Sequence, residues 1–289
     1  MVAAFDLALS GGPIVIAIAV VVALVMVWGG YFHSDKLAIA AAHGVPADPN
    51  DYRQLHNLVE GLCIGVGLPK PRIFIVDDPA PNAFATGRNP EHAAIAVTTG
   101  LLAIMNRTEL EGVLAHELSH IANDDILIGT IAVTLVGFLA LLSDVGLRLL
   151  IFGRIGGGRR RDSRDGTQIY IMALALVFLI MAPVAATALR FAISRRREAL
   201  ADVSGVLITR NPEGLISALG KLRDNSAIIA HAPAATAHLW IESPLDPRSH
   251  GGHGWFNRLF ETHPPLDARI AALHEAAGTM RNTQLARPV

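Results

Sequence analysis

The sequence predicts a mainly α-helical protein with a small β-sheet, an α+β architecture that also contains transmembrane helices. Three observations predict it. Hydrophobic residues make up 52% of the 289 residues and charged residues only 17%, which is too apolar for an ordinary soluble domain. Long stretches almost free of charge occupy residues 13–32, 126–152 and 167–193. The intervening and following segments combine helix-spaced apolar residues with a few short strand-like runs.

The first apolar stretch, residues 13–32, carries no charge and has about the length that spans a bilayer as a helix. It lacks the basic start and the small-residue cleavage site of a signal peptide, so we predict a retained membrane anchor. Residues 126–152 and 167–193 predict two further spans. The Gly- and Arg-rich residues 153–166 lie between them and are typical of an exposed, flexible loop. The two later spans would therefore form a hairpin.

A small sheet is predicted between the first and second apolar stretches. Residues 52–66 have helical periodicity, and residues 72–76, 82–87 and 93–97 then read as three short strands. An extended peptide could add to a free edge of this sheet, because backbone hydrogen bonds give affinity without demanding a sequence. An ordinary strand is the alternative interpretation. The candidate edge comprises Asn82, Ala83, Phe84 and Ala85.

The next element is a helix that carries the pattern H-E-x-x-H at residues 116–120. Thr108 and Glu111 have the spacing of a capping box, which predicts that the helix begins there. Apolar residues recur at helical spacing through residues 110–121 and give this helix a buried face.

The pattern predicts a metal site. His116 and His120 would lie one turn apart and project the same way, so both imidazoles can bind one zinc ion. Zinc with three protein ligands keeps a fourth position for water and lowers the pKa of that water to about 7. Glu117 could take the water's proton during attack on a carbonyl and pass it to the leaving amine. A solvated helix with two ordinary histidines is the alternative.

Two histidines need a third protein ligand. Glu198 follows a basic run on a helix predicted after the third apolar stretch, and a membrane hairpin would return residue 195 to the same membrane face as residue 125. This topology favours Glu198 as the third ligand. The alternative is that Glu198 is an ordinary surface carboxylate. Asp202, one turn later, better suits a hydrogen-bond acceptor for a ligand histidine. The remaining candidates are His231, His238, His250, His253 and His263.

Other features narrow the range of functions. The net charge is −1, which does not indicate binding to nucleic acid. The single cysteine, Cys63, excludes an intramolecular disulfide and reads as a small buried hydrophobe. A last helix is predicted over residues 264–277, with Leu266 and Leu273 turned inward and the stretch from Asp267 to Arg269 turned outward.

Four motifs together resemble peptidase family M48, the membrane zinc peptidases, and most closely its bacterial HtpX-type branch. They follow one another in the family's order and spacing between about residues 50 and 275. The motifs are Asn82–Gly87, His116–Asp125, Ser194–Asp202 and Thr262–Ile270. Relatives of this branch commonly carry two apolar segments before the protease domain, whereas this chain has one.

The resemblance implies a zincin-like metalloprotease with one zinc ion per chain. The zinc ligands would be His116, His120 and Glu198. Glu117 would be the general base, and Asp202 and Asn123 would support the ligands from outside the coordination sphere. The strand Asn82–Ala85 would pair with substrate. His263 is similar to a histidine that helps to stabilise the oxyanion, with a helix cap as its alternative role.

The resemblance also implies endoproteolysis of misfolded or surplus membrane proteins, without ATP or another nucleotide. The partners would be membrane-protein or unfolded polypeptide substrates and the lipid bilayer. We expect a bacterial inner-membrane protein whose active site faces the cytoplasm, although arginines on both sides of the hairpin do not settle its orientation. Competing functions are the processing of lipidated C-termini and a membrane scaffold with a structural metal.

These predictions divide the chain into four parts. They are an N-terminal anchor (1–32), a first protease part (33–125), a transmembrane hairpin (126–193) and a second protease part (194–289).

Overall fold

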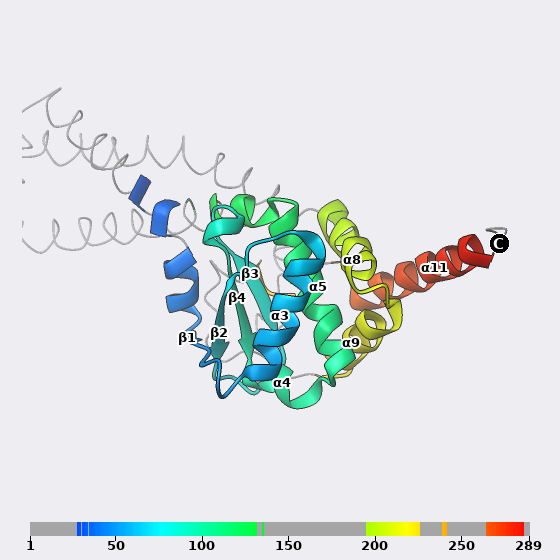
Figure 1. Ribbon diagram of the computed structural model, residues 1–289, viewed down its shortest axis with the longest axis horizontal. Coiled ribbons are helices and arrows are strands. Elements are labelled where there is room, and N and C mark those ends of the chain that lie inside the picture. Colours follow the sequence, from blue (N-terminus) through cyan, green and yellow to red (C-terminus); the bar gives the residue numbers. More distant parts are fainter. Residues whose placement is uncertain are drawn as a thin grey trace, which may run out of the picture. The chain divides into compact units, whose positions relative to one another are not determined.

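The computed structural model describes residues 28–29, 31–33, 35–131, 135, 195–225, 239–241 and 264–285 (Figure 1). The chain divides into two units, and the elements described below belong to the unit formed by residues 34–130 and 190–289. Nearly all of the three predicted spans lies outside the described residues. Within the part of the chain that is described, no helix is both long and apolar enough to cross a membrane. The four-part domain organisation stays a prediction.

A four-stranded mixed sheet with the order β1-β2-β4-β3 forms the centre of this unit. β2 and β4 run parallel, whereas the outer strands pair antiparallel with them. The strands are β1 (Val45–Pro46), β2 (Arg72–Val76), β3 (Ala83–Thr86) and β4 (Ala94–Thr98). The three predicted strands are confirmed to within one residue at each end, and β1 was not predicted from the sequence.

The two faces of the sheet bury different sets of side chains, because successive residues of a strand point to opposite faces. Ile75 and Val97 pack against helices α3 (Arg53–Val66) and α5 (Arg107–Ala122), which lie together on one face (Figure 1). On the other face Phe84 packs with Ala96 and Trp240. Burial on both faces explains why these strands show little polar alternation in the sequence.

Several helices accompany the sheet in the described part of the unit, where residues 35–41 and 125–131 are helical as well. Helix α3 confirms the helix predicted from residue 52 to residue 66. It ends at Gly67, which has φ +71°, a left-handed conformation that glycine adopts without steric cost. Further helices are α5, α8 (Arg195–Thr209), α9 (Pro212–Asp224) and α11 (Leu266–Leu285). A short helix α4 (Thr99–Ile104) and a 3-10 turn (Pro90–His92) connect strands and helices.

Helix α5 begins earlier than predicted. Asn106 is its N-cap: the Asn106 side chain accepts the Glu109 N–H at 3.0 Å, and the Glu109 carboxylate accepts the Asn106 N–H at 2.8 Å. The capping box assigned to Thr108 and Glu111 is therefore wrong. Glu109, and not Glu111, completes the capping box because it is buried and its carboxylate also accepts hydrogen bonds from Ser217 and Lys221 of α9.

Candidate metal centre

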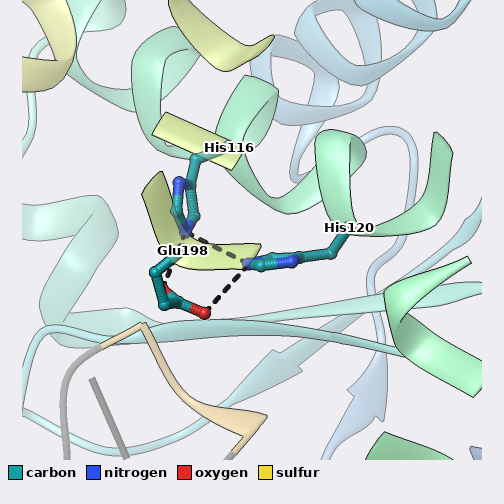
Figure 2. Close-up of side chains that lie close together, drawn as sticks. All are labelled: His116, His120 and Glu198. Carbon is teal, nitrogen blue, oxygen red and sulfur yellow. Dashed lines mark hydrogen bonds and ion pairs between the residues drawn. The ribbon is translucent and has the colours of Figure 1, made fainter. Parts of the chain in front are cut away.

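The two histidines of α5 converge on one point. The rings of His116 and His120 lie at 89° with centroids 4.8 Å apart, and their Nε2 atoms are 3.3 Å from each other (Figure 2). His116 has no exposed surface, and His120 is only partly exposed. A single helix turn therefore directs two imidazole nitrogens into a mostly buried space.

Helix α8 brings Glu198 to this pair. Its Oε2 lies 3.7 Å from His116 Nε2, and its Oε1 lies 3.6 Å from His120 Nε2 (Figure 2). One donor atom from each residue lies within 4.8 Å of the other two. A tetrahedral ion with bonds of about 2.1 Å holds its donor atoms about 3.4 Å apart, so the spacing and the N,N,O donor set fit zinc.

A glycine allows α8 to approach α5 this closely. Glu198, Asp202 and Gly205 follow one another at spacings of four and three residues and so lie on one face of α8. A Cβ atom added to Gly205 would lie 3.0 Å from the backbone nitrogen of His116 and 3.2 Å from its Cα. The absence of a side chain at position 205 thus sets the distance between the helix of the histidines and the helix of the carboxylate. Sequence reasoning missed this glycine.

Glu117 is almost completely buried beside the three candidate ligands. Burial raises the pKa of the Glu117 carboxyl to about 7. The His120 charge and a backbone hydrogen bond from Ala85 oppose this rise in pKa, whereas Glu198 adds to it. A carboxyl group with a pKa near neutrality, next to a candidate metal site, is suited to accept and return a proton.

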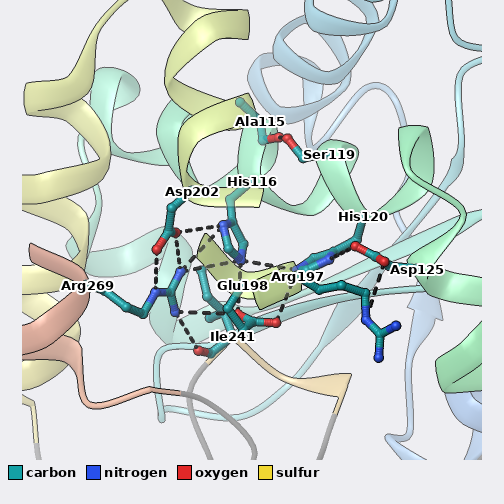
Figure 3. Close-up of polar contacts among 10 residues, drawn as sticks. All are labelled: Ala115, His116, Ser119, His120, Asp125, Arg197, Glu198, Asp202, Ile241 and Arg269. Carbon is teal, nitrogen blue, oxygen red and sulfur yellow. Dashed lines mark hydrogen bonds and ion pairs between the residues drawn. The ribbon is translucent and has the colours of Figure 1, made fainter. Parts of the chain in front are cut away.

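Each candidate histidine ligand has a carboxylate on its other ring nitrogen. Asp202 Oδ1 lies 3.0 Å from His116 Nδ1, and Asp125 Oδ2 lies 3.0 Å from His120 Nδ1 (Figure 3). An Nδ1–H that donates to a carboxylate fixes the tautomer and leaves Nε2 free to face the metal. Asp125 was not predicted in this role, although it follows His120 directly beyond the end of α5.

Asn123 does not take the supporting position expected of it. It is the C-cap of α5 and is exposed, and its backbone N–H donates to Ser119 at 3.0 Å. Among the contacts of the described residues, none joins the Asn123 side chain to His116, His120 or Glu198. The helix ends at this residue, so Asp125 is the carboxylate that reaches His120.

Arg269 of α11 is a further member of the centre. It was predicted to point outward, but only 3% of it is exposed. Its Nε donates to Asp202 Oδ2 at 2.9 Å, its Nη2 donates to Asp202 Oδ1 at 2.6 Å, and its Nη1 donates to the Ile241 carbonyl at 3.3 Å (Figure 3). The prediction was wrong because these buried acceptors, distant in sequence, attract a side chain that helical periodicity alone turns outward.

These charges act differently on the two histidines. Burial, with Arg269, lowers the pKa of His116 to about 4. Burial acts in the same direction on His120, but the Asp125 hydrogen bond and the carboxylates of Glu198 and Glu117 raise its pKa to about 9. In the metal-free protein at neutral pH, His116 is therefore neutral, whereas His120 is positively charged because both of its ring nitrogens are protonated.

Strand β3, the candidate substrate edge, is the last strand of the four-stranded sheet, but it is not free. Trp240 forms an isolated antiparallel bridge with Phe84, and the Ile241 N–H donates to the Ala83 carbonyl at 2.9 Å. The rings of Phe84 and Trp240 pack with centroids 4.5 Å apart. The expectation of an open edge is thus wrong at Ala83 and Phe84, because residues 239–241 pair there. Pairing of this strand with substrate stays a prediction.

The remaining histidine candidates lie outside the described residues. They are His231, His238, His250, His253 and His263.

Comparison with known proteins identifies the family. The model of peptidase family M48 matches residues 49–277 of the chain. The chain belongs to peptidase family M48. Its curated M48 relatives include the protease HtpX homolog of Caldanaerobacter subterraneus subsp. tengcongensis, 46% identical over 246 residues, which cover 85% of this chain and 79% of the relative. The protease HtpX homolog of Streptococcus gordonii is 42% identical over 267 residues, covering 92% and 86%.

A solved structure shares the fold described above. The crystal structure of S. mikatae Ste24p superimposes with a TM-score of 0.50 at 18% sequence identity. The match covers 89% of this chain and 57% of that chain. At this identity the likeness concerns the fold alone. The sequence resemblance to M48 is confirmed by the family match and the relatives, and the chain is a metallopeptidase of this family.

Proposed function

We propose that the protein is a membrane-bound zinc endopeptidase that cleaves misfolded or surplus membrane proteins. The observation that carries the proposal is the convergence of His116, His120 and Glu198 from two helices, with Glu117 buried beside them. The three apolar segments and the HtpX homologs support the membrane location. We further propose that the active site faces the cytoplasm.

The site has the composition of a catalytic centre. His116, His120 and Glu198 would hold one zinc ion per chain, and three protein ligands leave a fourth position open, whereas structural zinc sites use four. Zinc bound there supplies a Lewis acid that polarises the peptide carbonyl and lowers the pKa of water. Glu117 also argues against a scaffold with a structural metal, since such a site has no use for a buried carboxyl group with a raised pKa.

The side chains divide the proton transfers between them. The Glu117 carboxylate accepts the proton of the attacking water and then donates it to the leaving amide nitrogen. The carboxylates of Asp202 and Asp125 keep the Nδ1 proton on His116 and His120, so that the Nε2 lone pairs face the metal. Arg269 keeps Asp202 ionised: burial alone would raise the pKa of Asp202, but Arg269 and His116 lower it to about 2.

The proposed substrate is an extended polypeptide that pairs with β3, which at Ala83 and Phe84 requires that it displace residues 239–241. The backbone N–H of Ala85, on this strand, already donates to the Glu117 carboxylate, so β3 runs beside the general base. Recognition through backbone hydrogen bonds does not select a side-chain sequence, which suits misfolded chains of many sequences.

Replacement of Glu117 tests the mechanism. Detergent-purified Glu117→Gln should retain zinc with unchanged affinity but cleave casein or a membrane-protein substrate at least about 100-fold more slowly, because general acid–base catalysis supplies a factor of that order. Metal content by atomic absorption and cleavage with and without a chelator are the measurements. Glu111→Gln, on the same helix but away from the cluster, is the matched control and should behave as wild type. Cleavage by Glu117→Gln at the wild-type rate would show that another group is the base.

A further inference from the structure

One buried arginine joins the candidate zinc centre to the C-terminal helix. We infer that Arg269 is a positioning residue of the metal centre, which fixes Asp202 so that Asp202 can fix His116. The inference rests on the proposed zinc function. It concerns how the ligand set is held in place before metal binds, and no chemical step is assigned to the arginine.

The hydrogen bonds give the direction of this effect. Arg269 donates to both oxygens of Asp202, through Nε at 2.9 Å and Nη2 at 2.6 Å. This two-point contact fixes the plane of the carboxylate, since a guanidinium and a carboxylate match in geometry. Oδ1 of Asp202 also accepts the Nδ1–H of His116 at 3.0 Å. The plane set by Arg269 thus determines the direction from which the imidazole of His116 is held.

The charges of the buried site require a cation at this position. Glu117, Glu198 and Asp202 are each at most 6% exposed, and the guanidinium Nη1 of Arg269 lies 4.0 Å from Glu198 Oε2. With a zinc dication bound, Arg269 and the ion together balance the three carboxylates. Without Arg269, Asp202 would be a buried anion without its cation. This arrangement costs free energy, so the Asp202 side chain would move from its position beside His116.

The same guanidinium reaches the sheet. Its Nη1 donates to the carbonyl of Ile241 at 3.3 Å, and the N–H of Ile241 donates to the carbonyl of Ala83 in β3 at 2.9 Å. Arg269 therefore connects α11 with α8 through Asp202, with α5 through His116, and with β3 through Ile241. A side chain in this position sets the metal ligands and the neighbouring strand in one common geometry.

A double-mutant cycle on zinc affinity tests the inference. Arg269→Gln, Asp202→Asn and the double variant are purified in full-length form, and zinc dissociation constants are measured by competition with a chromophoric chelator. We expect each single variant to lose about 10–100-fold in affinity, the range found when supporting partners of metal ligands are removed. The double variant should lose no more zinc affinity than the single variant that binds zinc more weakly, because both changes break the same chain of contacts. Cobalt(II) spectra should change alike in all three.

Two further variants separate positioning from folding. Arg269→Lys keeps the charge without the two-point contact and should bind zinc with intermediate affinity. Arg223→Gln removes the ion pair, 3.1 Å long, between α9 and Asp267 of the same helix α11, and should leave zinc affinity and the cobalt spectrum unchanged. Circular dichroism verifies that each variant is folded, and the Arg269→Lys measurement stands if Arg269→Gln does not fold.

Two results would overturn the inference. One is a folded Arg269 variant with wild-type zinc affinity and cobalt spectrum. The other is a double variant whose loss is the product of the single losses, because Arg269 and Asp202 would then act independently. Failure of the proposed function has a different signature: the wild type itself would bind no zinc, or Glu117→Gln would cleave normally.

Discussion

His116 and His120 differ in protonation although they lie one turn apart on the same helix. His116 is buried next to the guanidinium of Arg269 and is neutral, with a pKa of about 4. Burial also acts to lower the pKa of His120, but the carboxylates around it raise that pKa to about 9. Because an imidazole binds metal only when it is unprotonated at the ligating nitrogen, zinc has to displace a proton from His120 alone.

This difference predicts how zinc affinity depends on pH. Between about pH 7.5 and 8.5, above the pKa of Glu117 and below that of His120, each rise of one pH unit should lower the zinc dissociation constant by a factor of about ten or more, since at least the proton of His120 is released. Asp125→Asn removes the carboxylate charge beside Nδ1 of His120, which helps to raise the pKa of His120. The pKa of His120 should then fall, so that less of the ring is protonated in this range and the slope should flatten. Chelator competition at a series of pH values measures it.

Asp124→Asn is the control for this experiment. Asp124 is adjacent and exposed, and its replacement should keep the wild-type slope. Equal slopes for wild type and Asp125→Asn would show that His120 is not the group that loses the proton.

At the scale of elements, the distance between α5 and α8 decides whether the ligand set closes. The close approach depends on Gly205, whose neighbours are backbone atoms of His116 that cannot move aside independently of the helix. Helix packing distances follow from the side chains at the contact, and glycine gives the shortest. The carboxylate of Glu198, two turns earlier on α8, is brought to the histidines in this way.

Gly205→Ala should therefore damage the metal centre from a distance. We expect zinc affinity to fall at least about tenfold and cleavage to fall with it, because a shift of α8 by less than 1 Å is felt by ligands with bonds of about 2.1 Å. Zinc titration and proteolysis assays are the measurements. Gly220→Ala in α9 is the matched control: a Cβ there meets open space, so it should bind zinc as wild type does. Wild-type affinity in Gly205→Ala would mean that α8 can shift without moving Glu198.

The start of α5 gives a second prediction at this scale. Asn106→Ala should destabilise the protein by about 1 kcal/mol, because it removes the N-cap acceptor of the Glu109 N–H. Thr108→Ala, two residues later and also exposed, should have almost no effect. Midpoints of thermal unfolding compare the two variants. If Thr108→Ala lost more stability than Asn106→Ala, the helix would begin at Thr108, as the sequence pattern predicts.

Local rules explain which parts of the fold and site were predictable. The strands β2, β3 and β4 and the helix α3 follow from short-range patterns of apolar residues and breakers, and all four are in the structure. Two capping boxes fit the sequence before α5, and the choice between them is made by Ser217 and Lys221 of another helix. A rule that uses only neighbouring residues cannot distinguish such alternatives.

In the candidate site, too, local sequence patterns predict some residues and contacts between elements decide the others. His116, Glu117 and His120 were found because a metal motif on one helix has a fixed spacing. Gly205, Asp125 and Arg269 were missed, because their roles depend on contacts between elements. For Arg269 the periodicity of α11 even indicates the wrong side of the helix. The charge is buried because it lies next to Asp202, which periodicity does not take into account.

At the scale of the whole molecule, the candidate ligands come from parts of the chain on either side of residues 126–193. A ligand that binds the folded state and not the unfolded state stabilises folding, and it does so by about 4 kcal/mol at a concentration 1,000 times its dissociation constant. Zinc should therefore act as a link between α5 and α8 that is additional to their side-chain packing.

Thermal unfolding should accordingly depend on zinc. Removal of zinc by a chelator should lower the midpoint of unfolding, and re-addition should restore it. Glu117→Gln should respond as wild type does, because Glu117 is not a proposed ligand, whereas His120→Ala should respond weakly or not at all. Differential scanning fluorimetry in detergent records both. A chelator-insensitive midpoint in the wild type would contradict a zinc ion shared between the two helices.

The position of Arg269 in the chain also affects the order in which the site is completed during synthesis. A ribosome that has translated as far as residue 125 has produced both imidazoles and the proton acceptor, but no carboxylate from α8 and no guanidinium from α11. The centre acquires Glu198 and Asp202 later, and Arg269 later still. An emerging polypeptide therefore carries an unfinished protease until nearly all of the described part of the chain has been translated.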